Sequence, residues 1–309
     1  MNAPRTRVQR RPVHGVLLLD KPLGLSSNDA LQKAKWLLRA EKAGHTGTLD
    51  PMATGVLPLC FGAATKFSQL HLDADKTYEA VAKLGVKTST GDAEGEVIER
   101  RDVPAQIDLA ALAVEFTGEM KQVPPMHSAL KKDGKALYEY ARAGVEVERE
   151  ARDITVHSLA IAQIGADELK FVAQVSKGTY IRTLGEDIGE AIGCGAHLVS
   201  LRRVATGPFK IDQCVTLAQL EAMNEEERLA KLLPVEALLP DHERVTLPPE
   251  DAGRFLSGMR RRGNWADHEQ VAVFGPDTIL GTAHVKAGEL IPGRLLAPTE
   301  IEQILGTRT

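Results

Sequence analysis

The sequence has few cysteines, and they lie too far apart to suggest a metal site. Cys60, Cys194 and Cys214 form no Cys-x-x-Cys or Cys/His spacing, so we predict no structural zinc site. Because their number is odd and no secretory signal precedes them, free thiols in a reducing cytoplasm are expected. Long apolar runs are also lacking, and none approaches the ~18 residues that span a bilayer. These absences predict a cytoplasmic protein with no membrane-spanning segment.

Charge of one sign is not in large excess either. The chain has 38 Lys and Arg against 42 Asp and Glu, which gives a formal net charge of −4. Bulk attraction to polyanions is therefore weak, and binding to nucleic acid would need a local basic face. The 309 residues are 43% apolar and 26% charged, which is typical of a globular protein of about two domains.

The hydrophobic pattern predicts an α+β fold with a mixed, mainly antiparallel sheet. Strands are expected near Val97 and at residues 16–19, 78–85, 169–175, 198–204, 271–274 and 280–285. Helices are expected at residues 31–38, 109–116, 137–143, 184–192 and 217–240. Strands and helices are mixed without the strict alternation of a βαβ protein, which favours this class.

Three parts are expected along the chain. Residues 1–14 form a basic N-terminal tail, with arginines and no acidic residue. Residues 15–243 form the main domain. The polar, proline-containing segment 241–249 marks a boundary, and residues 244–309 form a small β-rich domain.

The stretch 44–58 is rich in Gly, Thr and Pro and contains a single acid, Asp50. It lacks both the Gly-Lys-Ser/Thr of a phosphate loop and a Gly-x-Gly-x-x-Gly pattern, so nucleotide binding is not indicated. Pro51 biases Asp50 away from helix, and Gly47 and Gly55 permit a ligand or backbone to approach closely. A carboxylate in a rigid, uncharged loop is a candidate catalytic group, and an Asp that binds turn amides fits the pattern equally well.

Five further segments carry motifs in a fixed order. They are residues 15–22 (GVLLLDKP), 75–78 (DKTY), 123–129 (VPPMHSA), 176–182 (SKGTYIR) and 198–203 (LVSLRR). Together with 44–58 they resemble the TruB family of tRNA pseudouridine synthases from about residue 15 to 204. The resemblance implies a pseudouridine synthase fold for residues 15–243. It also implies a PUA-like RNA-binding domain for residues 244–309.

The resemblance implies three catalytic residues. Asp50 matches the catalytic carboxylate, Tyr78 the aromatic residue that packs on the target base, and Arg182 the arginine that pairs with the Asp. An arginine partner would keep the carboxylate ionised in an apolar pocket. Without the motif, Tyr78 would be read as a core residue of its strand and Arg182 as a surface arginine.

Four more residues are implied to bind substrate. His45 matches a residue that stacks in the opened T-loop, although a lone His is more often structural. Tyr180 and Leu201 match further positions of the substrate pocket. Lys21 matches a lysine of the Asp-Lys-Pro turn, and we assign it to substrate binding as well.

The implied reaction isomerises uridine 55, in the T-loop of tRNA, to pseudouridine. No redox cofactor, nucleotide or metal is expected, because an isomerisation consumes none of them. Asp50 would attack the sugar, add to the base or remove a ribose proton, and the sequence leaves these open. The target base lies inside the tRNA elbow, so base flipping into a dry, closed pocket is expected.

Basic clusters are candidate phosphate contacts, and a solvated charge run is the alternative for each of them. The candidates are Lys131, Lys132, Arg202, Arg203, Arg260 and Arg261. If several of them contact RNA, binding weakens steeply with added salt.

Three other functions are compatible with parts of the pattern. A glycosidase-type hydrolase needs two flanking carboxylates, whereas the central motif supplies Asp50 alone. A non-catalytic RNA-binding or RNA-chaperone protein would not need Asp50 or Arg182. A guide-RNA-dependent synthase would need a partner platform, for which the chain shows no sign. We therefore expect tRNA, through its T-stem-loop, as the partner of a monomer with no obligate protein partner.

Overall fold

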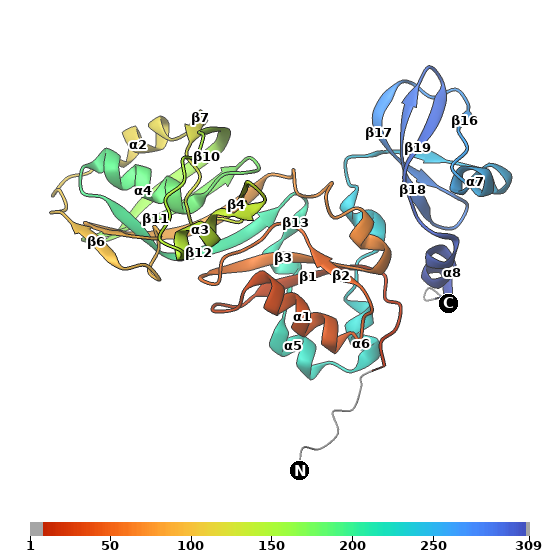
Figure 1. The fold of residues 1–309 in the computed structure, drawn as a ribbon, viewed down its shortest axis with the longest axis horizontal. Helices are drawn as coiled ribbons and strands as arrows, with labels where there is room; N and C mark the ends of the chain where they lie inside the picture. The colour runs from red at the N-terminus through yellow and green to blue at the C-terminus, as the bar shows by residue number, and fades with distance from the viewer. Residues whose placement is uncertain (1–8, 307–309) are drawn as a thin grey trace, which may run out of the picture. The chain divides into compact units, whose positions relative to one another are not determined.

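The computed structural model describes residues 9–306 (Figure 1). The chain divides into two compact units. Unit 1 contains residues 1–50, 57–72 and 212–309, and unit 2 contains residues 51–56 and 73–211. The basic tail predicted for residues 1–14 falls mostly outside the described residues. No helix within residues 9–306 is long and apolar enough to cross a membrane.

Three neighbouring strands follow the order β14 (Val215–Thr216), β1 (Gly15–Lys21) and β3 (Ala53–Phe61). Strands β14 and β1 belong to unit 1, and β3 begins in unit 2 and ends in unit 1. The short strand β2 (Ala43–His45) pairs antiparallel with β3. Helix α1 (Ser27–Leu37) begins where the Ser26 side chain accepts a hydrogen bond from the amide of Asp29. This helix and its cap confirm the prediction for the segment after the Asp-Lys-Pro turn. A 3₁₀ helix, η1 (Gly62–Lys66), follows β3.

The helix predicted at residues 217–240 is wrong as one helix. The structure has α5 (Leu217–Ala222), α6 (Glu225–Ala230) and the 3₁₀ helix η3 (Val235–Leu238). Met223 is extended, and Asn224 starts a new helix by a reciprocal capping box with Glu227. The three glutamates at positions 225–227 form the first turn of this second helix.

A separate five-stranded sheet begins at Glu243, next to the predicted boundary. Its strand order is β15 (Glu243–Thr246), β17 (His268–Phe274), β18 (Ile279–Lys286), β19 (Glu289–Leu295) and β16 (Arg261–Arg262). Helix α7 (Pro249–Leu256) and helix α8 (Pro298–Gly306) complete this region. Phe255 of α7 packs with Val245, Val273 and Leu290 in one apolar core. A small β-rich module is thus confirmed here, and its PUA-like RNA-binding role stays a prediction.

Unit 2 contains a mixed, mainly antiparallel sheet, as predicted. Its strand order is β3, β12 (Ala196–Thr206), β4 (Lys76–Leu84), β11 (Glu168–Val175), β10 (Arg152–Gly165) and β7 (Gly118–Gln122). All neighbours are antiparallel except β3 and β12, which are parallel. Unit 2 also contains two small hairpins, β5 (Val86–Thr88) with β6 (Val97–Arg100) and β8 (Lys131–Lys132) with β9 (Lys135–Ala136). Two of its helices are α2 (Leu109–Glu115) and α3 (Leu137–Arg142). The short strand β13 (Phe209–Lys210) pairs with β12. The 3₁₀ helix η2 (Ile211–Gln213) continues the chain after β13.

One face of the unit 2 sheet is covered by helix α4 (Ile181–Ile192), which packs against β12 and β4. The helix lies very close to the sheet because two of its residues are glycines. A Cβ on Gly185 would lie 2.7 Å from Cδ2 of Leu198, and one on Gly189 would lie 2.4 Å from the amide nitrogen of Ala196. The helix ends at Gly193, whose φ of 93° is left-handed, as the sequence predicts.

The three cysteines are free thiols in the structure. Cys60 and Cys194 are buried, and Cys214 is half-buried. Burial raises the pKa of the Cys60 thiol to about 12, so this side chain stays protonated.

Candidate functional site

Asp50 lies in unit 1, in the loop between β2 and β3, and its backbone neighbour is held by a buried serine. The Ser27 hydroxyl accepts a hydrogen bond from the Leu49 amide at 2.8 Å and donates one to the Leu49 carbonyl at 3.0 Å. Ser27 is only 2% exposed and opens helix α1. On the other side, Pro51 fixes its own φ. The half-buried Asp50 is thus held between a clamped residue and a rigid one.

The other two predicted site residues of unit 1 lie on the adjoining strands. His45 ends β2, opposite Leu59 of β3, and is half-buried. Lys21 ends β1 and is fully buried, and its ammonium group donates to the carbonyls of Pro22 at 2.9 Å and Leu25 at 2.5 Å. These two bonds stabilise the Asp-Lys-Pro turn. The assignment of Lys21 to substrate binding stays a prediction.

Tyr78 and Leu201 share one face of the unit 2 sheet. Residues of β4 alternate, so Tyr78 points to the same side as Ala80, and Leu201 of β12 is directly opposite Ala80. Tyr78 is 9% exposed and Leu201 6% exposed. Leu201 is also opposite Ala53, at the start of β3. This face is the one that α4 covers, so the tyrosine and the leucine lie in an apolar, water-poor layer.

Arg182 lies in the first turn of α4 and is held by three acceptors from other loops. Its guanidinium donates to the carbonyl of Thr90 at 2.9 Å and to the carbonyl of His127 at 2.7 Å. The Asp92 carboxylate lies 3.6 Å away, and both charged side chains are only 5% exposed. A buried cation needs such partners, since desolvating an unpaired charge is costly. Arg182 is therefore fixed in one orientation.

Tyr180 is the N-cap residue of α4, and a buried side chain binds its backbone. The Gln122 side-chain oxygen accepts from the Tyr180 amide at 2.7 Å, and its side-chain nitrogen donates to the Tyr180 carbonyl at 3.1 Å. Gln122 ends the edge strand β7 and is 3% exposed. The helix has no side-chain cap of its own. Gln122 therefore ties the start of α4 to the edge of the sheet.

The charge next to Tyr78 depends on pH. Lys76 lies two residues earlier in β4, on the same face. Its pKa is lowered to about 8, first by burial and then by the positive charge of Arg203, with Asp73 and Asp75 opposing the shift.

Within residues 9–306 no group of three or more His, Cys, Asp or Glu side chains could hold a metal ion.

The basic residues of unit 2 that we predicted to contact phosphate differ greatly in exposure. Lys131 and Lys132 are exposed on the β8–β9 hairpin, and the Lys132 ammonium group donates to the Glu148 carbonyl at 2.7 Å. Arg202 is half-buried and donates to the Thr54 hydroxyl at 3.2 Å. Arg203 is 1% exposed, and its side chain donates to the Val56 carbonyl. This burial argues against a phosphate contact by Arg203.

The basic run in the C-terminal sheet is largely paired with acids. Arg260 forms an ion pair with Glu289 at 3.3 Å, and Arg261 forms one with Asp251. The guanidinium groups of Arg262 and Arg260 hold the pKa of the Glu289 carboxyl below its usual value. An exposed arginine that already has a carboxylate partner attracts phosphate less strongly.

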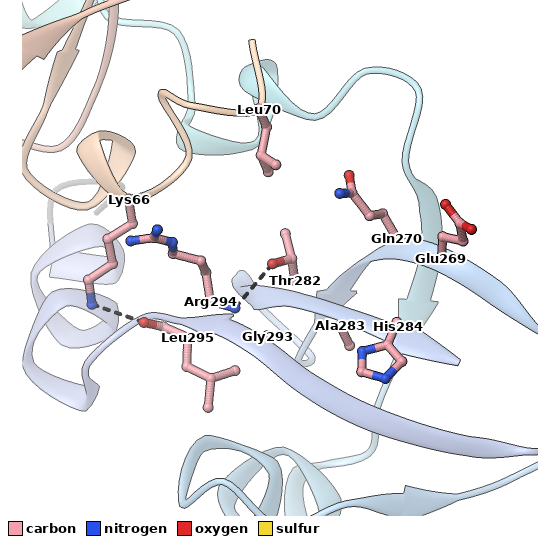
Figure 2. Close-up of a pocket in the computed structure, with 10 residues that line it drawn as sticks. All are labelled: Lys66, Leu70, Glu269, Gln270, Thr282, Ala283, His284, Gly293, Arg294 and Leu295. Carbon is pink, nitrogen blue, oxygen red and sulfur yellow. Dashed lines mark hydrogen bonds between the residues drawn. The ribbon is translucent and has the colours of Figure 1, made fainter. Parts of the chain in front are cut away.

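A hollow of about 690 Å³ lies elsewhere in unit 1 (Figure 2). It is lined by two residues of the segment at η1 and by the strands β17, β18 and β19: Lys66, Leu70, Glu269, Gln270, Thr282, Ala283, His284, Gly293, Arg294 and Leu295. The Lys66 ammonium group donates to the Leu295 carbonyl at 2.9 Å and to the Glu300 carboxylate at 2.6 Å. None of the residues that we predicted for the uridine site lines this hollow.

Sequence reasoning missed the residues that hold the predicted ones in place. Ser27, Asp92, Gln122 and His127 each contact a predicted residue or its direct neighbour. Of these, His127 and Ser27 lie in segments that the motifs include or adjoin. The other two had no local signal, because their partners are 58 or more residues away in the chain.

Two family profiles match the chain. Residues 35–181 match the TruB family pseudouridylate synthase N-terminal domain, and residues 182–240 match the tRNA pseudouridylate synthase B C-terminal domain. The chain is 61% identical over 316 aligned positions to tRNA pseudouridine synthase B of Verminephrobacter eiseniae, with 99% of this chain and 96% of the relative covered. It is 57% identical to the protein of that name from Cupriavidus pinatubonensis, with 94% and 96% covered.

Two solved structures of protein complexes contain a chain with a similar fold. A Cbf5–Nop10–Gar1 complex contains a chain that is 26% identical, with a TM-score of 0.70 and 96% of this chain and 92% of that chain covered. An H/ACA ribonucleoprotein bound to a substrate RNA containing 2′-deoxyuridine has a TM-score of 0.69 at 25% identity, with 96% and 88% covered. The predicted fold class is confirmed by this similarity.

Proposed function

The chain belongs to the TruB family of pseudouridylate synthases and isomerises uridine in tRNA, and we propose that its target is the T-loop uridine at position 55. The observation that carries the proposal is the layer in unit 2 where the buried Tyr78 and Leu201 share the face covered by α4, the helix that holds Arg182. An aromatic ring, an apolar wall and a fixed cation are the groups that a flipped uracil and a carboxylate require.

We propose that Asp50 is the carboxylate that starts the reaction. The C1′–N1 bond of the target uridine breaks, the uracil turns, and a bond forms between C1′ and C5 of the same base. The proton on C5 is then lost and N1 gains one, so the product is an isomer of the substrate. Asp50 acts as nucleophile at the sugar or the base, or as the base that removes a ribose proton. The clamp of Ser27 on Leu49 supports a fixed position for this carboxylate.

Tyr78 and Arg182 have complementary roles in this proposal. The Tyr78 ring packs on the extruded uracil, and its hydroxyl is the group that accepts the C5 proton or relays it. Arg182 pairs with the Asp50 carboxylate and keeps it ionised. A double-mutant cycle with Asp50→Glu and Arg182→Lys tests this pairing, because coupled residues give non-additive losses of kcat/KM.

We propose that RNA is recognised through the shape of the folded T-stem-loop. The target base is extruded from the loop, and His45 and Tyr180 stack on or line the opened loop. The exposed Lys131 and Lys132 contact the phosphates, and the C-terminal sheet adds a PUA-like RNA-binding surface. Lys21 supports the substrate pocket through the turn it stabilises.

We propose that the working enzyme is a cytoplasmic monomer that needs no cofactor and no protein partner. The relatives at 57–61% identity carry the name of a tRNA enzyme, whereas the structures titled as H/ACA or Cbf5 complexes share 25–26%. This difference favours a tRNA enzyme over a guide-dependent one. Light scattering of the purified protein, with and without tRNA, tests the monomer.

The decisive experiment compares the wild type with Asp50→Asn on an unmodified tRNA transcript. Pseudouridine is mapped by primer-extension stops after carbodiimide treatment, and a transcript with cytidine at position 55 is the RNA control. We expect a stop at position 55 with the wild type alone. Equal stops from both proteins would remove Asp50 from its role. Bound tRNA with no stop anywhere would replace the enzyme proposal by a binding or chaperone function.

A further inference from the structure

We propose that Gln122 is a positioning residue for the start of α4, and so for Tyr180 and Arg182. The side-chain amide of Gln122 binds both backbone groups of Tyr180, at 2.7 Å and 3.1 Å. Gln122 comes from the far edge of the sheet, 58 residues earlier in the chain. This inference rests on the proposed roles of Tyr180 and Arg182 in the reaction.

The two bonds require a side chain that accepts and donates at the same time. The amide group of Gln122 does both. Because Gln122 is 3% exposed, water does not easily substitute for it. A shorter amide at this position would not reach, and a hydrocarbon would leave both backbone groups of Tyr180 without this partner.

The backbone position of Tyr180 affects that of Arg182, because Arg182 is only two residues further along the chain. Arg182 is held in turn by the carbonyl of His127, which belongs to the segment that follows Gln122. Residues 122–127 therefore hold the start of α4 twice, once by the Gln122 side chain and once by the His127 carbonyl. Loss of the first contact lets the helix start move while the second still holds the guanidinium.

A carboxylic acid at position 122 provides a reversible test. In Gln122→Glu the ionised carboxylate accepts from the Tyr180 amide but repels the Tyr180 carbonyl oxygen. The protonated acid restores both bonds, and burial next to a carbonyl favours this neutral form. Activity of this variant relative to the wild type should therefore rise as the pH falls from about 8 to about 5.5.

The experiment compares Gln122→Ala and Gln122→Glu with Met120→Ala, a change in the same strand that does not touch Tyr180. Met120 is half-buried and opposite Ile154, so its loss weakens β7 without breaking the clamp. Pseudouridine formation on a T-arm RNA gives kcat and KM, and hydrogen exchange gives the protection of the Tyr180 amide. We expect Gln122→Ala to lose about 10-fold or more in kcat with a KM that stays within about threefold. Met120→Ala should keep the wild-type kcat.

Hydrogen exchange separates this inference from the proposed function. A Tyr180 amide that is unprotected in the wild type would overturn the inference, whether or not any variant folds. A wild-type kcat for Gln122→Ala, or a pH-independent ratio for Gln122→Glu, would also overturn it. A wild type that forms no pseudouridine on T-arm RNA contradicts the proposed function instead. In that case a protected amide that loses protection in Gln122→Ala still supports the clamp.

Discussion

The hydroxyl of Ser27 binds both backbone groups of Leu49, at 2.8 Å and 3.0 Å. The two residues are 22 positions apart, and the contact fixes the backbone that leads directly into Asp50. Because Ser27 is almost completely buried, water does not readily replace its hydroxyl as the partner of Leu49. The position of the proposed carboxylate thus depends on a side chain from helix α1.

Replacing Ser27 by Ala should lower both stability and activity. The change leaves the two buried backbone groups of Leu49 without this partner, which costs about 1–3 kcal/mol of unfolding free energy. We also expect a fall in kcat, because the Asp50 loop is no longer held. Ser26→Ala is the matched control: it removes the cap of α1 at a cost of about 0.5–2 kcal/mol, yet it does not touch Leu49. Urea denaturation and pseudouridine assays measure the two effects, and equal kcat values for the two variants would contradict this role.

The ion pair between Arg182 and Asp92 should matter for catalysis. Asp92→Asn keeps the oxygen that accepts from the Thr90 hydroxyl and the Glu94 amide, but it removes the negative charge. We expect a loss of about 1–3 kcal/mol in stability and about 10-fold or more in kcat, since the buried Arg182 loses a neutralising partner.

Asp153→Asn is the control for this prediction. It breaks an exposed ion pair with Lys121 at 2.8 Å, in which the Asp153 side chain is 88% exposed. Such pairs contribute about 0–1 kcal/mol, so stability and kcat should stay near the wild-type values. If Asp92→Asn behaves like Asp153→Asn, the charge at position 92 has no role in holding Arg182.

Lys76 should make the stability of the protein rise between pH 8 and 10.5. Its pKa is about 8 in the folded chain, lowered by burial first, and 10.5 is its ordinary value. In this window the unfolded chain binds more protons than the folded chain, so the unfolding free energy increases with pH. One proton gives a slope of at most ~1.4 kcal/mol per pH unit.

The measurement is urea denaturation of the wild type and Lys76→Met at pH 7.5, 8.5 and 9.5. Other groups titrate equally in both proteins, so the difference between the two curves isolates Lys76. We expect the advantage of the variant to be largest at pH 7.5 and to shrink as the pH rises. If the difference in unfolding free energy between the two proteins is constant across the series, burial does not lower the pKa of Lys76.

The exposed hairpin lysine Lys131 should contribute to RNA binding through charge alone. Lys131→Ala should weaken binding to a T-arm RNA and reduce the slope of log K against log salt by about 0.7–0.9, the value for one phosphate contact. Lys170→Ala removes the same charge from strand β11, where Lys170 pairs with Glu79 at 3.0 Å. Filter binding at several salt concentrations measures both variants, and equal slopes for the two would contradict a contact at the hairpin.

The sequence predicts best where the structural signal is local. The cap of α1, the alternation of Tyr78, Ala80 and Ala82, and the Gly193 end of α4 all depend on neighbouring residues, and each is confirmed. The long strand β10 has no comparable signal, because much of it is exposed and its polar and apolar residues alternate irregularly. The break between α5 and α6 was missed because the Asn224 capping box lies inside an otherwise helical pattern.

The candidate site divides in the same way. Asp50, Tyr78 and Arg182 are found from sequence because motifs of a known family include them. The contacts of Ser27 with Leu49 and of Gln122 with Tyr180 join distant segments, so no pattern in either segment predicts them. For Arg203 the sequence pattern is misleading. The pair Arg202 and Arg203 predicts an RNA-binding surface, but the Arg203 side chain is buried in the core.

The parallel pairing of β3 with β12 has a consequence for how the protein is made. Leu201 is opposite Ala53, and Arg203 is opposite Gly55, with about 147 residues between the partners. At about 5–20 residues per second, a ribosome needs roughly 7–30 s to synthesise the intervening chain. During this time β3 already has its upstream neighbours β1 and β2 but lacks β12, so one edge of this apolar strand is open to wrong pairing. The strand that follows Asp50 therefore keeps one unpaired edge until β12 has been synthesised.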